Sequence, residues 1–413
     1  MRRPGEIARL GGVALLVWVS GCAAPSRTDV AVAPSPAASA EARPLGDGWE
    51  TATPETAGMD RGRLEALTDT IRRYPDWNIH AVLIERDGRL VYEEYFAGQD
   101  QRWGRPLGRI VFDRDTKHDL RSVSKSVVSA LLGIARGAGK IDSLDRPIIE
   151  LFPELAELAT PERRRVTLRH ALTMAAGFEW NEILPYTNPR NDEIGMIRSP
   201  DPIRFALDRP VVAEPGTLWN YNGGLTQLLG AVVQRSTGQP LLDYARSTLF
   251  EPLGISDVDW DGDLTGVPAA ASGLRLRPRD LAKFGSLYLH GGRWRGRQII
   301  PADWVSESIR RHVALPTAVT AYGTHGYGYQ WWHTCYRTAS GTLETPSAVG
   351  NGQQRIYVLP QLRLVVTMLA GRYNDPTAAR LPDRLLLEQI VPAVRQPAGA
   401  GPTREPAGCA GPA

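Results

Sequence analysis

A serine and a lysine three residues apart begin a strongly apolar segment of the chain. Ser122 and Lys125 lie in residues 121–126 (RSVSKS), the only Ser-x-x-Lys in the sequence, and apolar residues dominate from there to Gly137. Residues three apart share one face of a helix, so the two side chains are expected to meet. A serine hydroxyl becomes a nucleophile when a base takes its proton. A lysine amine can be that base if burial and the helix dipole lower its pKa.

The composition makes this lysine informative. The chain has 48 lysines and arginines, of which four are lysines, namely Lys117, Lys125, Lys140 and Lys283, and 44 (48 − 4) are arginines. Arginine does not lose its proton in proteins, whereas lysine can. A lysine at the start of a buried helix therefore favours a role in proton transfer. Taken alone, the four residues also fit an ordinary helix start with a capping serine.

Length, charge and missing motifs exclude several classes of function. The chain has 413 residues, 42% of them hydrophobic, which suits a globular protein with a large core. Its net charge of +3 and its scattered arginines do not indicate a nucleic-acid partner. The sequence contains no His-Glu-x-x-His, phosphate loop, dinucleotide fingerprint or Gly-x-Ser-x-Gly elbow. We expect no cofactor and no metal, and we assign His118 and His170 supporting roles in the fold.

Residues 1–22 have the features of an export signal. Arg2 and Arg3 precede an apolar run, residues 10–19, that is too short to span a bilayer comfortably. The run ends in the sequence VSGC, which resembles a bacterial lipobox and implies that Cys22 becomes a lipid-modified N-terminus. Because alanine follows Cys22, the usual sorting pattern implies an outer-membrane anchor facing the periplasm. A cleaved secretory signal is the alternative, which would leave the protein periplasmic or secreted.

Two biased segments bound the predicted folded domain, residues 48–395. Residues 23–47 are rich in alanine, proline and serine and predict a flexible linker. Residues 396–413 are rich in proline, glycine and alanine and predict a disordered tail. Cys335 and Cys409 could pair outside the cytoplasm, but the position of Cys409 in this tail disfavours a structural disulfide.

Strand patterns lie at both ends of this domain and helical patterns in its middle. Asp87-Gly88 is a strong two-residue hairpin signal, and the expected strands are 79–85, 89–96, 327–332, 354–359 and 364–370. Helices are expected at 60–73, 122–137, 225–236, 274–289 and 381–394, and the long polar stretch 178–210 is expected to be an irregular functional loop. This predicts an α/β (α+β) fold, in which helices flank an antiparallel sheet formed from both ends of the domain. An all-helical subdomain of about residues 119–290 comes from the middle.

Three patches of sequence together resemble one enzyme family. They are the Ser122–Lys125 pair, Tyr221 after a Pro-Gly-Thr turn, and residues 347–353 (SAVGNGQ) before a strand. Residues 170–177, 215–217 and 228–230 match further landmarks at the family's usual spacings. From about Trp49 to Val394 the chain resembles the serine β-lactamase, penicillin-binding protein and family VIII esterase superfamily. The similarity is greatest to its class C-like branch, near the aminohexanoate-oligomer hydrolases.

The resemblance implies a β-lactamase-like fold and a catalytic trio. Ser122 would be the nucleophile, Lys125 its base and Tyr221 the second proton carrier. The oxyanion hole would combine the Ser122 backbone N–H with one from the strand edge at residues 350–352, that is Gly350, Asn351 and Gly352. Tyr186 is the candidate for a substrate-contacting tyrosine. Asn222 is a further candidate contact, although its side chain would point elsewhere.

The chain departs from the family pattern at two motifs. The motif Tyr-x-Asn has Gly223 in place of its asparagine, and the motif Lys/His-Thr/Ser-Gly is replaced by residues 348–350 (AVG), which carry no cation. Both changes remove groups that recognise penicillins and leave the acylation residues in place. We therefore expect a serine hydrolase that acts through an acyl-enzyme on ester or small amide substrates in the cell envelope. The alternatives are a peptidoglycan DD-peptidase or weak β-lactamase, and a non-catalytic ligand-binding envelope lipoprotein.

Overall fold

The computed structural model describes residue 42, residues 45–315, 324–338 and 341–395, and residues 406, 408 and 409. The predicted signal segment with Cys22, most of the linker and most of the tail lie outside the described residues. No helix within the described residues is long and apolar enough to cross a membrane.

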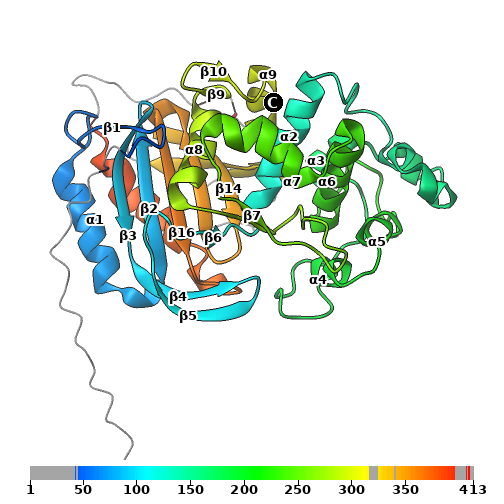
Figure 1. The fold of residues 1–413 in the computed structure, drawn as a ribbon, viewed down its shortest axis with the longest axis horizontal. Helices are drawn as coiled ribbons and strands as arrows, with labels where there is room; N and C mark the ends of the chain where they lie inside the picture. Colours follow the sequence, from blue (N-terminus) through cyan, green and yellow to red (C-terminus); the bar gives the residue numbers. More distant parts are fainter. Residues whose placement is uncertain are drawn as a thin grey trace, which may run out of the picture. The chain divides into compact units, whose positions relative to one another are not determined.

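A nine-stranded sheet joins the two ends of the domain (Figure 1). Its strand order is β1-β3-β2-β16-β15-β14-β13-β12-β11, and all neighbours are antiparallel except β1 and β3. The pairing of β2 with β16 unites the two ends, which confirms the predicted sheet. The strands are β1 (Glu50–Thr51), β2 (Ile79–Arg86), β3 (Arg89–Tyr95), β11 (Val313–Leu315), β12 (Thr324–Tyr327), β13 (Trp332–Thr338), β14 (Gly341–Gly350), β15 (Gln354–Leu359) and β16 (Leu364–Ala370).

The central strands β2, β15 and β16 are buried almost throughout because both faces of the sheet are covered. Successive side chains of a strand point to opposite faces. In β2, Ala81 and Leu83 therefore join one core cluster, and Val82 and Ile84 join the other. The predicted hairpin between β2 and β3 is confirmed.

Different helices cover the two faces. Helix α1 (Arg61–Arg73) starts at the capping residue Asp60 and shares a core cluster with the last helix, which runs through α10 (Leu381–Leu385), η10 (Leu386–Ile390) and η11 (Val391–Ala393). Helix α8 (Pro278–Leu289) packs on β2, β15 and β16 and places Leu281 and Phe284 in the other cluster. The predicted flanking helices are thus present on both faces.

The middle of the chain supplies most of the remaining helices, with α2 at their centre. The middle supplies α2 (Val123–Gly137), α3 (Leu168–Leu172), α4 (Asp192–Ile197), α5 (Pro202–Leu207), α6 (Gly223–Thr237) and α7 (Leu241–Ala245), with the short helical segments η2 (Ile148–Leu151), η3 (Pro153–Leu158), η4 (Arg163–Arg165), η5 (Arg246–Phe250) and η6 (Glu251–Leu253). Helix α9 (Ala302–Ile309) and the short helical segments η1 (Pro75–Trp77), η8 (Pro360–Leu362) and η9 (Pro376–Ala378) lie outside it. Helix α2 contacts α6 on one side and strands β14 and β15 on the other. The helix that starts at Ser122 therefore joins the sheet to the helical part.

The structure also contains small sheets that the sequence patterns did not predict. A hairpin pairs β4 (Ala97–Arg102) with β5 (Arg105–Val111), and another pairs β9 (Arg293–Trp294) with β10 (Arg297–Gln298). Strand β8 (Leu274–Leu276) pairs with β6 (His118–Asp119) and β7 (Asp259–Trp260). The middle of the chain is therefore not entirely helical, and the predicted helix at 274–289 begins only at Pro278.

Two further predictions about elements are wrong. The predicted strand 327–332 is a chain reversal between β12 and β13, and Gln330 within it has a positive φ of 64°. Alternating aromatic and polar residues there suggested a strand, but the aromatic rings pack around the reversal. The predicted irregular loop 178–210 contains α4 and α5, which Asn191 and Asp201 cap at their N-termini.

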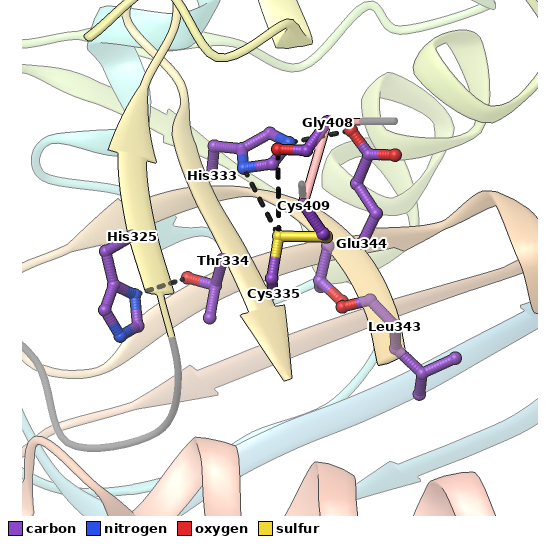
Figure 2. The surroundings of a disulfide bond; sticks show 9 residues. His325, His333, Thr334, Cys335, Leu343, Glu344, Gly408 and Cys409 are labelled. Atoms are coloured by element: carbon purple, nitrogen blue, oxygen red, sulfur yellow. Dashed lines mark hydrogen bonds and ion pairs between the residues drawn. A yellow bond between two sulfur atoms is a disulfide. The ribbon is translucent and has the colours of Figure 1, made fainter. Parts of the chain in front are cut away.

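Cys335 and Cys409 form a disulfide, so the prediction against one is wrong. Figure 2 shows Cys335 of β13 joined to Cys409, with Glu344 of β14 next to Gly408. A side chain at position 408 would collide with the Glu344 carboxylate, so glycine permits the close approach. Cys409 is buried and its N–H donates to Pro406 (2.9 Å). This part of the predicted disordered tail is therefore fixed against the sheet.

Candidate active site

Ser122 follows a residue whose backbone conformation is strained. Arg121 has φ of 51°, in the left-handed region that residues other than glycine rarely adopt. Its guanidinium pairs with Asp119 (3.1 Å) and lies over the Tyr373 ring (5.0 Å to the centroid). Ser122 makes no side-chain capping bond to α2, so its hydroxyl is available to other partners.

The two serines beside Lys125 fix the start of α2 to neighbouring segments. Ser124 Oγ donates to the Arg121 carbonyl (2.7 Å) and accepts from the Leu274 N–H of β8 (3.2 Å). Ser126 Oγ donates to the Gln330 carbonyl (2.7 Å) in the reversal before β13. All three bonds are buried or partly buried, and they hold the first turn of α2 in place beside Ser122.

Lys125 lies against three oxygen atoms in the interior. Its Nζ is 3.1 Å from Ser122 Oγ, 3.0 Å from the Ala271 carbonyl and 3.4 Å from Glu193 Oε2. The Glu182 carboxylate is slightly farther, at 3.8 Å. The side chain is 1% exposed, so these contacts replace water almost completely. The predicted meeting of serine and lysine on the first turn is confirmed as geometry.

The expected fall of the Lys125 pKa is wrong. Burial alone would lower it, but Glu193, Tyr221 and Glu182 outweigh burial and raise the pKa of Lys125 above its ordinary value. The sequence argument considered burial and the helix dipole and did not foresee two carboxylates at the amine. At neutral pH the resting site therefore holds an ammonium group, whose three protons match the three nearest oxygens.

Tyr221 approaches the same serine from the segment before α6. Its ring lies 5.0 Å from Lys125 Nζ, and its phenol is near enough to Ser122 for that hydroxyl to lower the pKa of Tyr221. Burial raises the pKa of the Tyr221 phenol, and the charge of Lys125 partly opposes this rise. Trp332 of β13 stacks on the ring at 5.7 Å and Trp219 packs beside it. The structure thus brings Ser122, Lys125 and Tyr221 together.

Glu182 and Glu193 are site residues that the sequence reasoning missed. Both are buried, and they lie close enough for each to shift the pKa of the other. Burial and the neighbouring Glu193 raise the pKa of Glu182 to about 8. Burial would also raise the pKa of Glu193, but Lys125 and further hydrogen bonds lower it. At neutral pH the pair therefore shares one proton, with Glu182 as the acid and Glu193 as the carboxylate.

The edge of β14 lies beside the serine, as the oxyanion-hole prediction requires. A side chain at Gly350 would collide with the Leu120 carbonyl, two residues before Ser122. Asn351 does not use its side chain at the serine, since its amide donates to Asn374 (3.0 Å) and its oxygen accepts from the Asn374 N–H (2.8 Å). Gly352 has φ of 97° and supports the turn into β15. The donor roles of these residues remain predictions.

Tyr186 and Asn222 use their side chains within the protein. The Tyr186 hydroxyl donates to Glu182 Oε1 (2.8 Å), so this tyrosine reaches the site through the acid pair. Asn222 is buried and its side-chain oxygen caps α6 by accepting from the Leu225 N–H (3.1 Å). The side-chain oxygen of Asn222 is therefore used in a structural role, and its assignment as a substrate contact remains a prediction.

Among the described residues, His80, Asp100 and His118 form a buried group that could hold a metal ion. His80 Nδ1 and His118 Nε2 are 2.8 Å apart, a hydrogen-bond distance. Two ligands of a tetrahedral ion with bonds of about 2.1 Å would be roughly 3.4 Å apart. Asp100 accepts from the Tyr373 hydroxyl (2.9 Å). The two rings are therefore arranged for a hydrogen bond that joins β2 to β6, and β6 ends two residues before the strained Arg121.

Comparisons with known proteins agree with this fold and chemistry. The chain matches the model of the Beta-lactamase family over residues 68–389. It is 26% identical over 345 residues to 6-aminohexanoate-dimer hydrolase of Paenarthrobacter ureafaciens, covering 78% of this chain and 81% of that protein. It is 30% identical over 204 residues to esterase EstB of Burkholderia gladioli, covering 47% and 50%. A solved structure, a putative 6-aminohexanoate-dimer hydrolase from Bacillus anthracis, superposes with a TM-score of 0.64 at 19% identity, covering 86% and 90%.

The fold, the buried Ser122–Lys125 contact and these relatives define a serine hydrolase. The chain belongs to the Beta-lactamase family.

Proposed function

We propose that this protein hydrolyses ester or small amide substrates through an acyl-enzyme on Ser122. The observation that carries the proposal is the 3.1 Å contact between Lys125 Nζ and Ser122 Oγ in a water-poor interior. Ser122 Oγ would attack the substrate carbonyl, and Tyr221 would protonate the leaving group. The Ser122 N–H and the β14 edge would stabilise the oxyanion, a contribution of about 10²–10³ in rate for each donor.

The substrate class follows from what the site lacks and from the names of the relatives. Residues 348–350 (AVG) supply no cation for a substrate carboxylate, and Gly223 supplies no amide. Trp219 and Trp332 offer partly exposed apolar rings beside Tyr221. Relatives named as an esterase and an aminohexanoate-dimer hydrolase support ester and small amide substrates over β-lactams.

A fluorophosphonate probe, which modifies activated serines, tests the proposal. We expect stoichiometric labelling of the wild-type protein and none of Ser122→Ala. Equal labelling of both proteins, or no labelling of either, would refute the assignment and favour a non-catalytic binding protein. Turnover of a short-chain nitrophenyl ester, measured beside a chromogenic cephalosporin, then ranks the substrates. A faster rate on the cephalosporin would favour the β-lactamase alternative.

The proposal includes attachment to the cell envelope through a lipid on Cys22. The signal pattern and the VSGC sequence support it, and a disulfide between Cys335 and Cys409 suits an oxidising compartment. An alkyne-tagged fatty acid fed to an expressing bacterium should label the wild-type protein and not Cys22→Ala. Labelling of neither protein would indicate a cleaved, unanchored form.

A further inference from the structure

Gly223 is the point at which the site departs from its family, and the structure shows what fills the space. A side chain at this position would start in collision with Glu193 Oε2 and would lie 3.1 Å from Glu182 Oε2. The asparagine of the Tyr-x-Asn motif therefore cannot coexist with the two glutamates. The carboxylates stand where the amide would be, next to the amine of Lys125 (3.4 Å from Glu193 and 3.8 Å from Glu182).

The surroundings hold the two carboxyl groups in different states. Glu182 accepts from the Gly223 N–H (2.6 Å), the Trp180 indole (2.8 Å) and the Tyr186 hydroxyl (2.8 Å). Glu193 accepts from the Ser272 hydroxyl (2.6 Å) and from Lys125. Glu193 therefore touches the amine directly, and Glu182 acts on it mainly through Glu193.

The charged lysine raises the question of where the serine proton goes. An ammonium group has no lone pair and cannot take a proton from Ser122. In a buried site the amine must first pass a proton to a nearby acceptor. Of the three oxygens within 3.5 Å of Nζ, the Ala271 carbonyl is a weak base and Ser122 is the donor, so Glu193 remains.

We propose that Glu193 is the proton acceptor behind Lys125, and that Glu182 positions it and holds the pair at a single negative charge. This inference rests on the proposed acyl-enzyme function. Lys125 transfers one proton from Nζ to Glu193 Oε2, which leaves a neutral amine and a carboxylic acid. Ser122 Oγ then bonds to the substrate carbonyl carbon, its proton passes to Lys125, and the carbonyl π pair moves to the oxygen.

The remaining transfers restore the site. The bond to the leaving group breaks as Tyr221 gives it a proton, Lys125 reprotonates Tyr221, and Glu193 returns its proton to Lys125. The net result is an acylated Ser122 and a protonated leaving group, with Lys125 again an ammonium and Glu193 again a carboxylate. No metal or redox partner is needed for this balance.

The matched variants Glu193→Gln and Glu182→Gln test the relay, because they make the same change at adjacent carboxyl groups. We expect Glu193→Gln to slow fluorophosphonate labelling of Ser122 by about 10²–10³ at pH 7, within the range of a general base. Its labelling rate should rise steadily with pH up to pH 10, since the amine must now lose its proton to solvent. Glu182→Gln should slow labelling less. The wild-type labelling rate should change near pH 8, where Glu182 titrates, and Glu182→Gln should lose this change. The exposed Glu179→Gln, on the same segment, is the surface control.

Thermal unfolding and substrate binding separate this role from a structural one. A Glu193→Gln protein that keeps its melting temperature and KM but loses kcat supports the relay, and partial recovery in Glu193→Asp supports it further. A wild-type labelling rate in Glu193→Gln, an unshifted pH profile, or a larger loss in Glu182→Gln would overturn the inference. If the wild-type protein itself is not labelled, the acyl-enzyme function fails and the relay fails with it. The two failures are therefore distinguishable.

Discussion

The acid pair predicts a pH dependence of stability that a single substitution should remove. Burial and Glu193 raise the pKa of Glu182 from 4.5 to about 8 in the folded protein. Between these two values the unfolded chain has lost the Glu182 proton and the folded chain keeps it. The unfolded state therefore binds fewer protons, and the free energy of unfolding falls as pH rises.

The size of this effect follows from the two pKa values. The rise of about 3.5 pH units corresponds to about 5 kcal/mol, at about 1.4 kcal/mol per unit. At pH 4, Glu182 is mostly protonated in both the folded and the unfolded state and should cost the folded state almost nothing. Above pH 8, Glu182 is ionised in both states, and the folded state should bear the whole free-energy cost. In Glu182→Gln this dependence should be absent, because the amide does not titrate.

Urea unfolding of both proteins from pH 4 to pH 9 measures the difference directly. Contributions from titrating groups that do not interact with Glu182 cancel when the two free energies of unfolding are subtracted at each pH. We expect the free energy of unfolding of Glu182→Gln, relative to that of the wild-type protein, to rise by roughly 1.4 kcal/mol per pH unit between pH 4.5 and 8. Above pH 8 the difference should stay constant. Parallel curves would show that Glu182 ionises at its ordinary pKa, and the shared proton would then be refuted.

Three further predictions follow from the site and the disulfide. Lys125→Arg should lower the labelling rate of Ser122 by about 10³ at every pH from 6 to 10, because arginine keeps the charge but does not lose a proton. An arginine variant that is labelled at the wild-type rate would contradict the role of Lys125. Gly223→Asn should lower the melting temperature through overpacking of about 1–3 kcal/mol, and adding Glu193→Ala should restore it, whereas independent effects would argue against the shared space. Cys409→Ser opens a loop of 74 residues and should destabilise the fold by up to about 4 kcal/mol, seen as a lower urea midpoint under non-reducing conditions and no difference under reducing ones.

Local patterns were sufficient to predict much of the fold. The Asp87-Gly88 turn and the apolar runs on both sides predicted the hairpin of β2 and β3, and the helical pattern of residues 60–73 predicted α1. Patterns failed where tertiary contacts decide the structure. Cys409 lies in a sequence typical of disordered tails, yet the disulfide and a glycine next to Glu344 fix it to β13. The reversal before β13 looked like a strand because its aromatic residues alternate.

The site was predictable to the extent that its residues are close in sequence or carry a family motif. The meeting of Ser122 and Lys125 follows from helical spacing, and Tyr221 follows from its motif. Glu182 and Glu193 are 57 and 68 residues after Lys125, on a segment that carries none of the family motifs named above. A signal was nevertheless present at Gly223. A glycine in place of a polar motif residue indicates that something else occupies the space, and Glu182 and Glu193 are among the acidic residues of the preceding segment 178–210.

The charges of the site connect the two departures from the family motifs. Where the family places a cation in its third motif, an anionic substrate group has a partner; here residues 348–350 provide none. Lys125, the cation in contact with Ser122, is already compensated by Glu193 at 3.4 Å. A substrate carboxylate would therefore lose its hydration without gaining an ion pair, which costs several kcal/mol in a buried site. A neutral ester or amide has no such cost. In the proposed relay, the carboxylate that accepts the lysine proton would also disfavour anionic substrates, so catalysis and substrate choice would depend on the same buried pair.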